Sequence, residues 1–242
     1  MNGVILLDKP AGWTSHDCVA SVKKRINAKK VGHLGTLDPL ATGLLVLVVN
    51  GATRFARFLD GGRKDYQVSM RLGATTDTYD SEGAVLSTGD TSSITDEAVV
   101  AAFSSFSGPI KQIPPMYSAI KKGGVPLYRL ARRGEVIERE ARDVEIFSLD
   151  ILRISLPDVD FRVVCSKGTY VRSICNDVGA LLGCGGHLSS LRRMASGPFL
   201  VDNAPGPDAD PEVLKAAVIP LGEALSMAQA PAEALGMAAA IG

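Results

Sequence analysis

Six consecutive apolar residues, Leu44 to Val49, constrain the fold most, because no polar position interrupts them. Such a run is typical of a strand buried on both faces of a sheet. A glycine-rich segment, Gly32–Gly43, comes immediately before it and contains one carboxylate, Asp38. Between Cys18 and Leu37 there is no acidic residue, but there are five basic ones: Lys23, Lys24, Arg25, Lys29 and Lys30. A lone carboxylate between a buried strand and a polyanion-attracting segment is a candidate nucleophile.

Two other interpretations of the Gly32–Gly43 segment follow from its residues. Asp38-Pro39 is a common way to open a turn, and the neighbouring Gly and Thr are ordinary loop chemistry, so a purely structural turn fits as well. A phosphate-binding P-loop fits less well, because the Gly-Lys-Ser/Thr ending is missing and a strand follows where a helix should. The residues alone leave the choice between turn and nucleophile loop open.

Hydrophobic periodicity predicts a mixture of strands and helices along the chain. Strands are expected over Val4–Asp8, Leu44–Val49, Tyr66–Leu72, Val144–Leu156 and Asp160–Ser166. Helices are expected over Ser15–Asn27, Ala52–Leu59, Asp96–Ser105, Tyr170–Leu182 and Pro211–Ala217, the third with Thr95 as its N-cap. With 46% apolar residues in 242, the chain can bury a sizeable core.

The net charge is zero, but charge is unevenly distributed. Between Lys111 and Arg142, eight basic and three acidic residues give +5, whereas one basic and six acidic residues from Asp202 onward give −5. A protein can bind nucleic acid through a local cluster of basic residues even when its net charge is zero. Residues 113–142 contain a Pro-Pro pair, a Gly-Gly pair and a short helix expected at Leu127–Arg133. They are interpreted either as a mobile flap that orders on its ligand or as a solvent-exposed hairpin.

Six segments carry polar or aromatic residues, and all but the third contain glycine: Gly3–Ser15, Gly32–Gly43, Arg63–Val68, Thr76–Gly83, Ser166–Arg172 and Leu182–Arg193. In this order they resemble the motifs of the pseudouridine synthases, in the subgroup of tRNA pseudouridine synthase B. The resemblance implies an α+β fold with a central mixed, mostly antiparallel β-sheet flanked by helices and loops. It implies a catalytic domain over residues 1–200, with residues 113–142 as an RNA-clasping thumb, and a C-terminal extension over residues 201–242 without a full RNA-binding domain.

The same resemblance implies isomerisation of a uridine in tRNA to pseudouridine, at uridine 55 in the T loop. The base must be extruded from the folded RNA, and Asp38 then attacks either the uracil ring or the ribose anomeric carbon. Catalytic roles are implied for Asp38, Tyr66 and Arg172. Contacts with substrate or RNA are implied for a larger set: His33, Tyr170, Leu191, Lys9, Arg54, Asp80, Arg132 and Arg133. No cofactor is expected, because the reaction involves no redox step or group transfer.

Two of these residues have competing interpretations. Arg172 lies in the first turn of its expected helix, where the macrodipole disfavours a cation, so an anion is expected nearby. We expect Asp38 to be that anion, in a bidentate pair that keeps the carboxylate charged; a phosphate contact is the alternative. Tyr66 shares a strand face with Val68, Met70 and Leu72, which predicts a core residue, whereas the resemblance favours stacking on the uracil.

Partners and compartment are also constrained. The cysteines have no CxxC spacing and no cluster has the spacing of metal ligands, so no metal is expected. Strand-length apolar runs and an N-terminus without a signal-peptide pattern predict a cytoplasmic protein without a membrane span. We expect the tRNA T arm as partner, no obligate protein partner, and a monomer. Two rival classes are an RNA-binding module or RNA chaperone without catalysis, and a hydrolase that needs a second carboxylate, Asp77 or Asp80.

Overall fold

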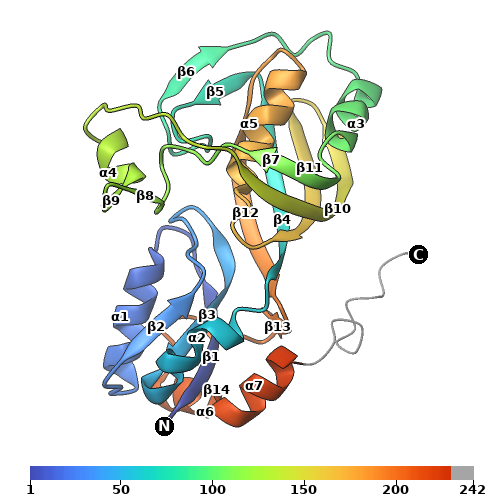
Figure 1. Cartoon of the computed structure of the whole chain (residues 1–242). Coiled ribbons are helices and arrows are strands. Elements are labelled where there is room, and N and C mark those ends of the chain that lie inside the picture. The colour runs from blue at the N-terminus through green and yellow to red at the C-terminus, as the bar shows by residue number, and fades with distance from the viewer. Residues whose placement is uncertain (230–242) are drawn as a thin grey trace. The chain divides into compact units, whose positions relative to one another are not determined.

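The computed structural model describes residues 1–229, which form two compact units. Unit 1 consists of Met1–Tyr66 and the described residues from Leu191 onward, and unit 2 of Gln67–Ser190 (Figure 1). Two strands, β4 (Arg63–Leu72) and β12 (Gly186–Ser196), contain residues of both units. The predicted division at residue 200 stays a prediction, and residues 230–242 of the predicted extension lie outside the described residues.

Strand β3 (Thr42–Val49) is the central strand of unit 1. It pairs antiparallel with β1 (Gly3–Lys9) and with β2 (Val31–Leu34), and it pairs in parallel with β12. Short strands β14 (Val218–Pro220) and β13 (Phe199–Leu200) extend the sheet beside β1 and β12. Alternate β3 side chains enter two separate hydrophobic cores. The prediction that this apolar run is a strand buried on both faces is therefore confirmed.

Helices cover both faces of the sheet in unit 1. On one face, α1 (Ser15–Arg25) and α6 (Pro211–Ala216) bury their apolar residues against the odd-numbered residues of β3. On the other, the 3₁₀ helix η1 (Asn50–Phe55), α2 (Ala56–Leu59) and α7 (Leu221–Gln229) pack against the even-numbered ones. Helix α1 begins with a reciprocal capping box between Thr14 and Asp17, which fixes where the helix starts. The result is a three-layer arrangement of helix, sheet and helix.

Unit 2 is built on the strand order β4, β11 (Asp158–Ser166), β10 (Arg142–Ser155) and β7 (Gly108–Gln112), with β10 antiparallel to both of its neighbours. Helices α3 (Asp96–Ser104) and α5 (Val171–Leu181) belong to this unit, and the ring of Phe103 packs edge-on against Phe161 with centroids 5.0 Å apart. Strands β5 (Ala74–Thr76) and β6 (Val85–Thr88) form a separate two-stranded sheet. Among the strand pairs described above, only that of β12 with β3 is parallel, so the central sheet is mixed and mostly antiparallel, which confirms the predicted α+β fold.

The basic insertion, residues 113–142, has a hydrophobic core of its own. It contains strands β8 (Lys121–Lys122) and β9 (Val125–Pro126), followed by α4 (Leu127–Ala131) (Figure 1). Met116, Leu127 and Leu130 are buried together. The predicted short helix is confirmed, ending two residues before Arg133. Mobility of this segment stays a prediction.

Candidate active site

Three buried side chains of unit 1 hydrogen-bond to the main chain around Asp38. The hydroxyl of Ser15, at the start of α1, accepts the N–H of Leu37 at 2.9 Å and donates to the carbonyl of the same residue at 3.0 Å. On the other side of Asp38, the Pro39 carbonyl accepts from the Lys9 ammonium at 3.1 Å and from the Gly12 N–H at 2.9 Å. The backbone that carries Asp38 is therefore fixed on both sides of the carboxylate, as preorganised catalysis requires.

Arg193 supplies the third attachment of this loop. Its side chain is only 1% exposed, and its guanidinium donates to the Leu44 carbonyl at 2.7 Å and to the Gly35 carbonyl at 3.1 Å. The parallel pairing of β12 with β3 places Arg193 opposite Gly43, where an added Cβ would overlap the Arg193 carbonyl oxygen. Glycine is required there because β12 passes so close. Arg193 thus ties both ends of the Gly35–Leu44 segment to one strand.

The same guanidinium affects His33, which lies on β2 just before the loop. Burial lowers the pKa of His33, and the positive charge of Arg193 lowers it further. Its Nδ1 atom is buried and has no hydrogen-bond partner among the described residues. His33 is therefore held in its neutral form near neutral pH, and it can contact a base edge without adding a charge.

Two other predicted residues of unit 1 lie on buried strand faces. Tyr66 is 8% exposed and shares its face of β4 with Val68, Met70 and Leu72, which confirms the periodicity-based prediction of a core-facing tyrosine. Leu191, 9% exposed, accepts at its carbonyl from the Thr42 hydroxyl at 3.4 Å. Their contacts with uracil stay predictions.

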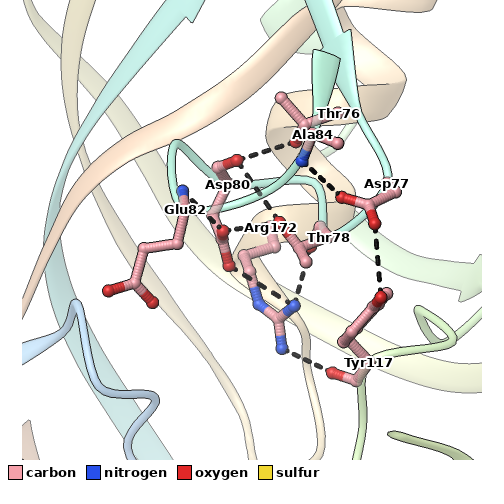
Figure 2. A network of polar contacts seen from close by, with 8 residues as sticks. All are labelled: Thr76, Asp77, Thr78, Asp80, Glu82, Ala84, Tyr117 and Arg172. Atoms are coloured by element: carbon pink, nitrogen blue, oxygen red, sulfur yellow. Dashed lines mark hydrogen bonds and ion pairs between the residues drawn. The ribbon is translucent and has the colours of Figure 1, made fainter. Parts of the chain in front are cut away.

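In unit 2, Arg172 is the centre of a buried polar network (Figure 2). The guanidinium points away from α5 and donates to the carbonyls of Thr78 at 2.7 Å and Tyr117 at 2.8 Å. Its Nη1 atom lies 3.6 Å from a carboxylate oxygen of Asp80, with both side chains at most 7% exposed. The expected anion near Arg172 is present in unit 2 as Asp80. The predicted pair with Asp38 joins residues of different units and stays a prediction.

The network also fixes the loop between β5 and β6 and one residue of the insertion. Asp80 accepts from the Thr78 hydroxyl at 2.6 Å and from the Glu82 N–H at 3.1 Å, and Asp77 accepts from the Ala84 N–H at 2.8 Å (Figure 2). The Tyr117 hydroxyl donates to Asp77 at 3.2 Å, and burial, with the adjacent carboxylate, raises the pKa of that tyrosine. Asp77 and Asp80, the two candidates for the second carboxylate of a hydrolase, thus both accept hydrogen bonds that stabilise this loop.

A side-chain amide positions the residues just before Arg172. Gln112, at the end of β7, accepts the N–H of Tyr170 at 2.7 Å and donates to its carbonyl at 3.0 Å. These two hydrogen bonds hold the backbone of Tyr170, the residue that precedes α5 and makes no side-chain capping hydrogen bond. Gln112 therefore fixes the direction in which α5 starts, and with it the position of Arg172.

The other predicted RNA-contact residues differ in exposure. Arg54, Arg132 and Arg133 are exposed, as phosphate contacts would have to be. Lys9 is fully buried, and its ammonium donates to the carbonyls of Pro10, Trp13 and Pro39. Its position fits a role in shaping the Asp38 loop rather than a surface contact, so its predicted RNA contact has no support from its exposure.

Sequence reasoning missed Ser15, Gln112 and Arg193 as residues that shape the site. One signal was available for Arg193: in Leu191-Arg192-Arg193-Met194-Ala195 it has the same strand parity as the apolar Leu191 and Ala195. For Gln112 and Ser15, the long-range partners Tyr170 and Leu37 are visible only in the folded chain.

Two features of residues 1–229 concern metal ions and membranes. No group of three or more His, Cys, Asp or Glu side chains in this range is arranged to hold a metal ion. None of the helices in this range is both long and apolar enough to cross a membrane.

Comparison with known proteins adds the family. Residues 23–171 match the N-terminal domain of the TruB family of pseudouridylate synthases, and residues 172–226 match the C-terminal domain of tRNA pseudouridylate synthase B. The protein named tRNA pseudouridine synthase B of Syntrophotalea carbinolica is 50% identical over 204 residues, covering 84% of this chain and 67% of that protein. The protein of the same name in Burkholderia mallei is 52% identical over 210 residues, covering 86% and 69%.

Solved structures agree with this assignment. A chain in the crystal structure of a Cbf5-Nop10-Gar1 complex matches with a TM-score of 0.71 and 33% identity, over 93% of this chain and 62% of that one. A chain in the structure of an H/ACA RNP bound to a substrate RNA containing 2′-deoxyuridine matches with a TM-score of 0.61 and 32% identity, over 83% and 49%. This chain thus spans less than two thirds of those two chains. With family models covering residues 23–226 and relatives half identical over most of the sequence, the chain belongs to the TruB family of pseudouridylate synthases.

Proposed function

We propose that this protein isomerises a uridine of tRNA to pseudouridine, with Asp38 as the nucleophile. The observation that carries the proposal is the fixed backbone on both sides of Asp38, held by Ser15, Lys9 and Arg193 within a family of pseudouridylate synthases. A turn with only a structural role needs no attachment by two fully buried cations. A nucleophile does, because a misplacement of about 1 Å costs about 100-fold in rate.

The reaction balances without a cofactor. The Asp38 carboxylate attacks either the uracil ring or the ribose anomeric carbon, and the N1–C1′ glycosidic bond breaks. The uracil turns within the site and forms a C5–C1′ bond, after which the proton on C5 is lost, N1 holds a proton, and Asp38 is released. Tyr66 would stack on the uracil, and Leu191 and Tyr170 would shape the space around it. The neutral His33 would contact the extruded nucleotide.

Arg172 is proposed as a positioning residue for this reaction. Its buried network with Asp80, Thr78 and Tyr117 connects the loop after β5 to the first residues of the insertion. The bidentate pair with Asp38 that the sequence predicts would add a direct electrostatic role, keeping the nucleophile charged.

The substrate is proposed to be the T arm of tRNA, with uridine 55 of the T loop as the target. The name shared by the relatives supports tRNA as the substrate, the positive charge of the insertion suits an RNA partner, and the T-loop target follows from the motif resemblance. We also infer a monomer, without an obligate protein partner, that works in the cytoplasm. All four cysteines are buried and none forms a disulfide, as is usual in a reducing compartment.

A product analysis tests the function. A tRNA transcript incubated with the protein is digested to nucleosides, and pseudouridine is separated from uridine by chromatography before mass spectrometry. One pseudouridine per tRNA is expected, and none in a transcript whose T-loop uridine is replaced by cytidine. Absence of pseudouridine with RNA still bound would support the non-catalytic RNA-binding alternative, and release of free uracil would support the hydrolase.

A further inference from the structure

The segment from η1 to α2 has an unusual distribution of large and small side chains. Ala52 and Leu59 are fully buried against the sheet of unit 1, and Ala56 packs beside them. The two phenylalanines of the segment face outward instead: Phe55 is 38% exposed and Phe58 51%. Aromatic rings normally supply much of a core's buried area, so this segment keeps its smaller side chains inside and its largest ones in solvent.

The two rings form one surface with two arginines, here called the aromatic face: Arg54, Phe55, Arg57 and Phe58. The ring centroids lie 6.5 Å apart, at an interplanar angle of 44°. The Arg57 guanidinium lies over the Phe58 ring, 4.6 Å from its centroid, and Arg54 is exposed. No acidic residue occurs from Asn50 to Leu59. The surface therefore offers flat π faces and positive charge together.

That combination fits one chemical class of partner. Unpaired nucleotides present a π face on each base and a negative charge on each phosphate, and proteins bind them by stacking bases on aromatic rings and arginine planes. An apolar protein segment would use the rings but leave two guanidinium groups without an anion. The charge of the aromatic face thus favours RNA over a protein partner.

We propose that the aromatic face stacks an unpaired base of the RNA substrate, with Arg54 and Arg57 on the flanking phosphates. This rests on the proposed function, because it assigns a second contact to the same RNA. The site lies on η1 and α2, whereas Asp38 lies on the loop between β2 and β3. It would hold the RNA through a base other than the one that reacts.

Substitutions that separate stacking from charge test this proposal through the Kd for tRNA, measured at several salt concentrations. Phe55→Leu combined with Phe58→Leu keeps apolar bulk but removes both π faces, and is expected to weaken binding at least about fivefold with an unchanged salt slope. Replacing both residues with Tyr should keep Kd within about twofold of wild type. Arg57→Gln should reduce the slope of log Kd against log salt by about 0.7–0.9.

The control is Val213→Ala, which removes an equally exposed aliphatic side chain on α6 and should leave Kd unchanged. Thermal unfolding confirms that each variant is folded. A double Leu variant that binds tRNA within twofold of wild type would overturn the proposal and leave this face to a protein partner. Failure of the proposed function is separate: wild-type protein would then bind tRNA through this face yet form no pseudouridine.

Discussion

At the scale of single residues, the buried charge of Asp80 depends on Arg172 as its partner. The two side chains are 7% and 5% exposed, so removing the cation leaves a buried carboxylate without its charge partner. We expect Arg172→Met to lower the free energy of unfolding by about 3–5 kcal/mol, measured by urea denaturation. The matched control is Arg71→Met, whose ion pair with Asp158 is 55% and 39% exposed and should be worth less than about 1 kcal/mol. Equal losses in the two variants would contradict the buried network.

His33 makes stability depend on pH. Burial and the charge of Arg193 hold its pKa below the ordinary value of about 6.5, so the unfolded chain takes up a proton first as the pH falls. The contribution of the neutral His33 side chain to the free energy of unfolding is therefore complete above pH 6.5 and is lost as the pH falls below that value. Unfolding free energies measured between pH 7 and pH 5 should therefore decline more steeply for wild type than for His33→Gln. Parallel curves would show that His33 titrates alike in both states.

Ser15 tests whether the fixed loop matters for catalysis. Ser15→Ala leaves the buried N–H of Leu37 without its acceptor, which costs about 1–3 kcal/mol of stability. We expect a slower single-turnover rate of pseudouridine formation with an unchanged Kd for tRNA, because only the nucleophile's position changes. Ser21→Ala, on the same helix, removes a hydrogen bond to the Pro207 carbonyl and should keep the wild-type rate. A Ser15→Ala variant at full rate would show that the attachment is only structural.

Which single residues could be predicted depended on the kind of interaction. Tyr66 was placed correctly on a core face, because strand periodicity is local in the sequence. Burial of Lys9, Lys64 and Arg193 could not be predicted, since each depends on carbonyls or side chains brought near by folding. A buried cation looks like a surface residue in a sequence until its partners are known.

At the scale of elements, long periodic segments were predicted well and polar ones were missed. The expected strand over Val144–Leu156 is β10, and the expected helix over Asp96–Ser105 is α3 with Thr95 as its cap. Strand β12 was missed because its inward positions include His187 and Arg193, which hide the apolar alternation. The expected helix over Ala52–Leu59 is divided into η1 and α2.

The basic insertion is the element whose charge can be tested directly. Arg132 and Arg133 follow α4 and are exposed. If both contact phosphates, replacing them with Gln should weaken tRNA binding and reduce the slope of log Kd against log salt by about 1.5. The matched control replaces Arg71 and Arg153, also exposed arginines of unit 2, with Gln and should keep the slope. An unchanged slope in the insertion variant would show that its charges only face solvent.

At the scale of the whole molecule, the sequence predicted the fold class and the family, while the division into units came only from the structure. Asp38 and Tyr66 belong to unit 1 and Arg172 and Tyr170 to unit 2, although β4 and β12 contribute residues to both. Motif order along a chain does not tell which residues share a compact unit, because that depends on strand pairing far apart in sequence. The predicted pairing of Asp38 with Arg172 therefore remains a question for a double-mutant cycle.

The central claim is that Asp38 carries out the isomerisation. The most direct measurement is the pseudouridine content of tRNA after incubation with wild type, Asp38→Asn, and the control Asp202→Asn, which changes an exposed carboxylate of unit 1 in the same way. Asp38→Asn should fold and bind tRNA like wild type yet form no pseudouridine, because an amide cannot act as the nucleophile, while Asp202→Asn should convert one uridine per tRNA. Substantial pseudouridine formation by Asp38→Asn would contradict the account.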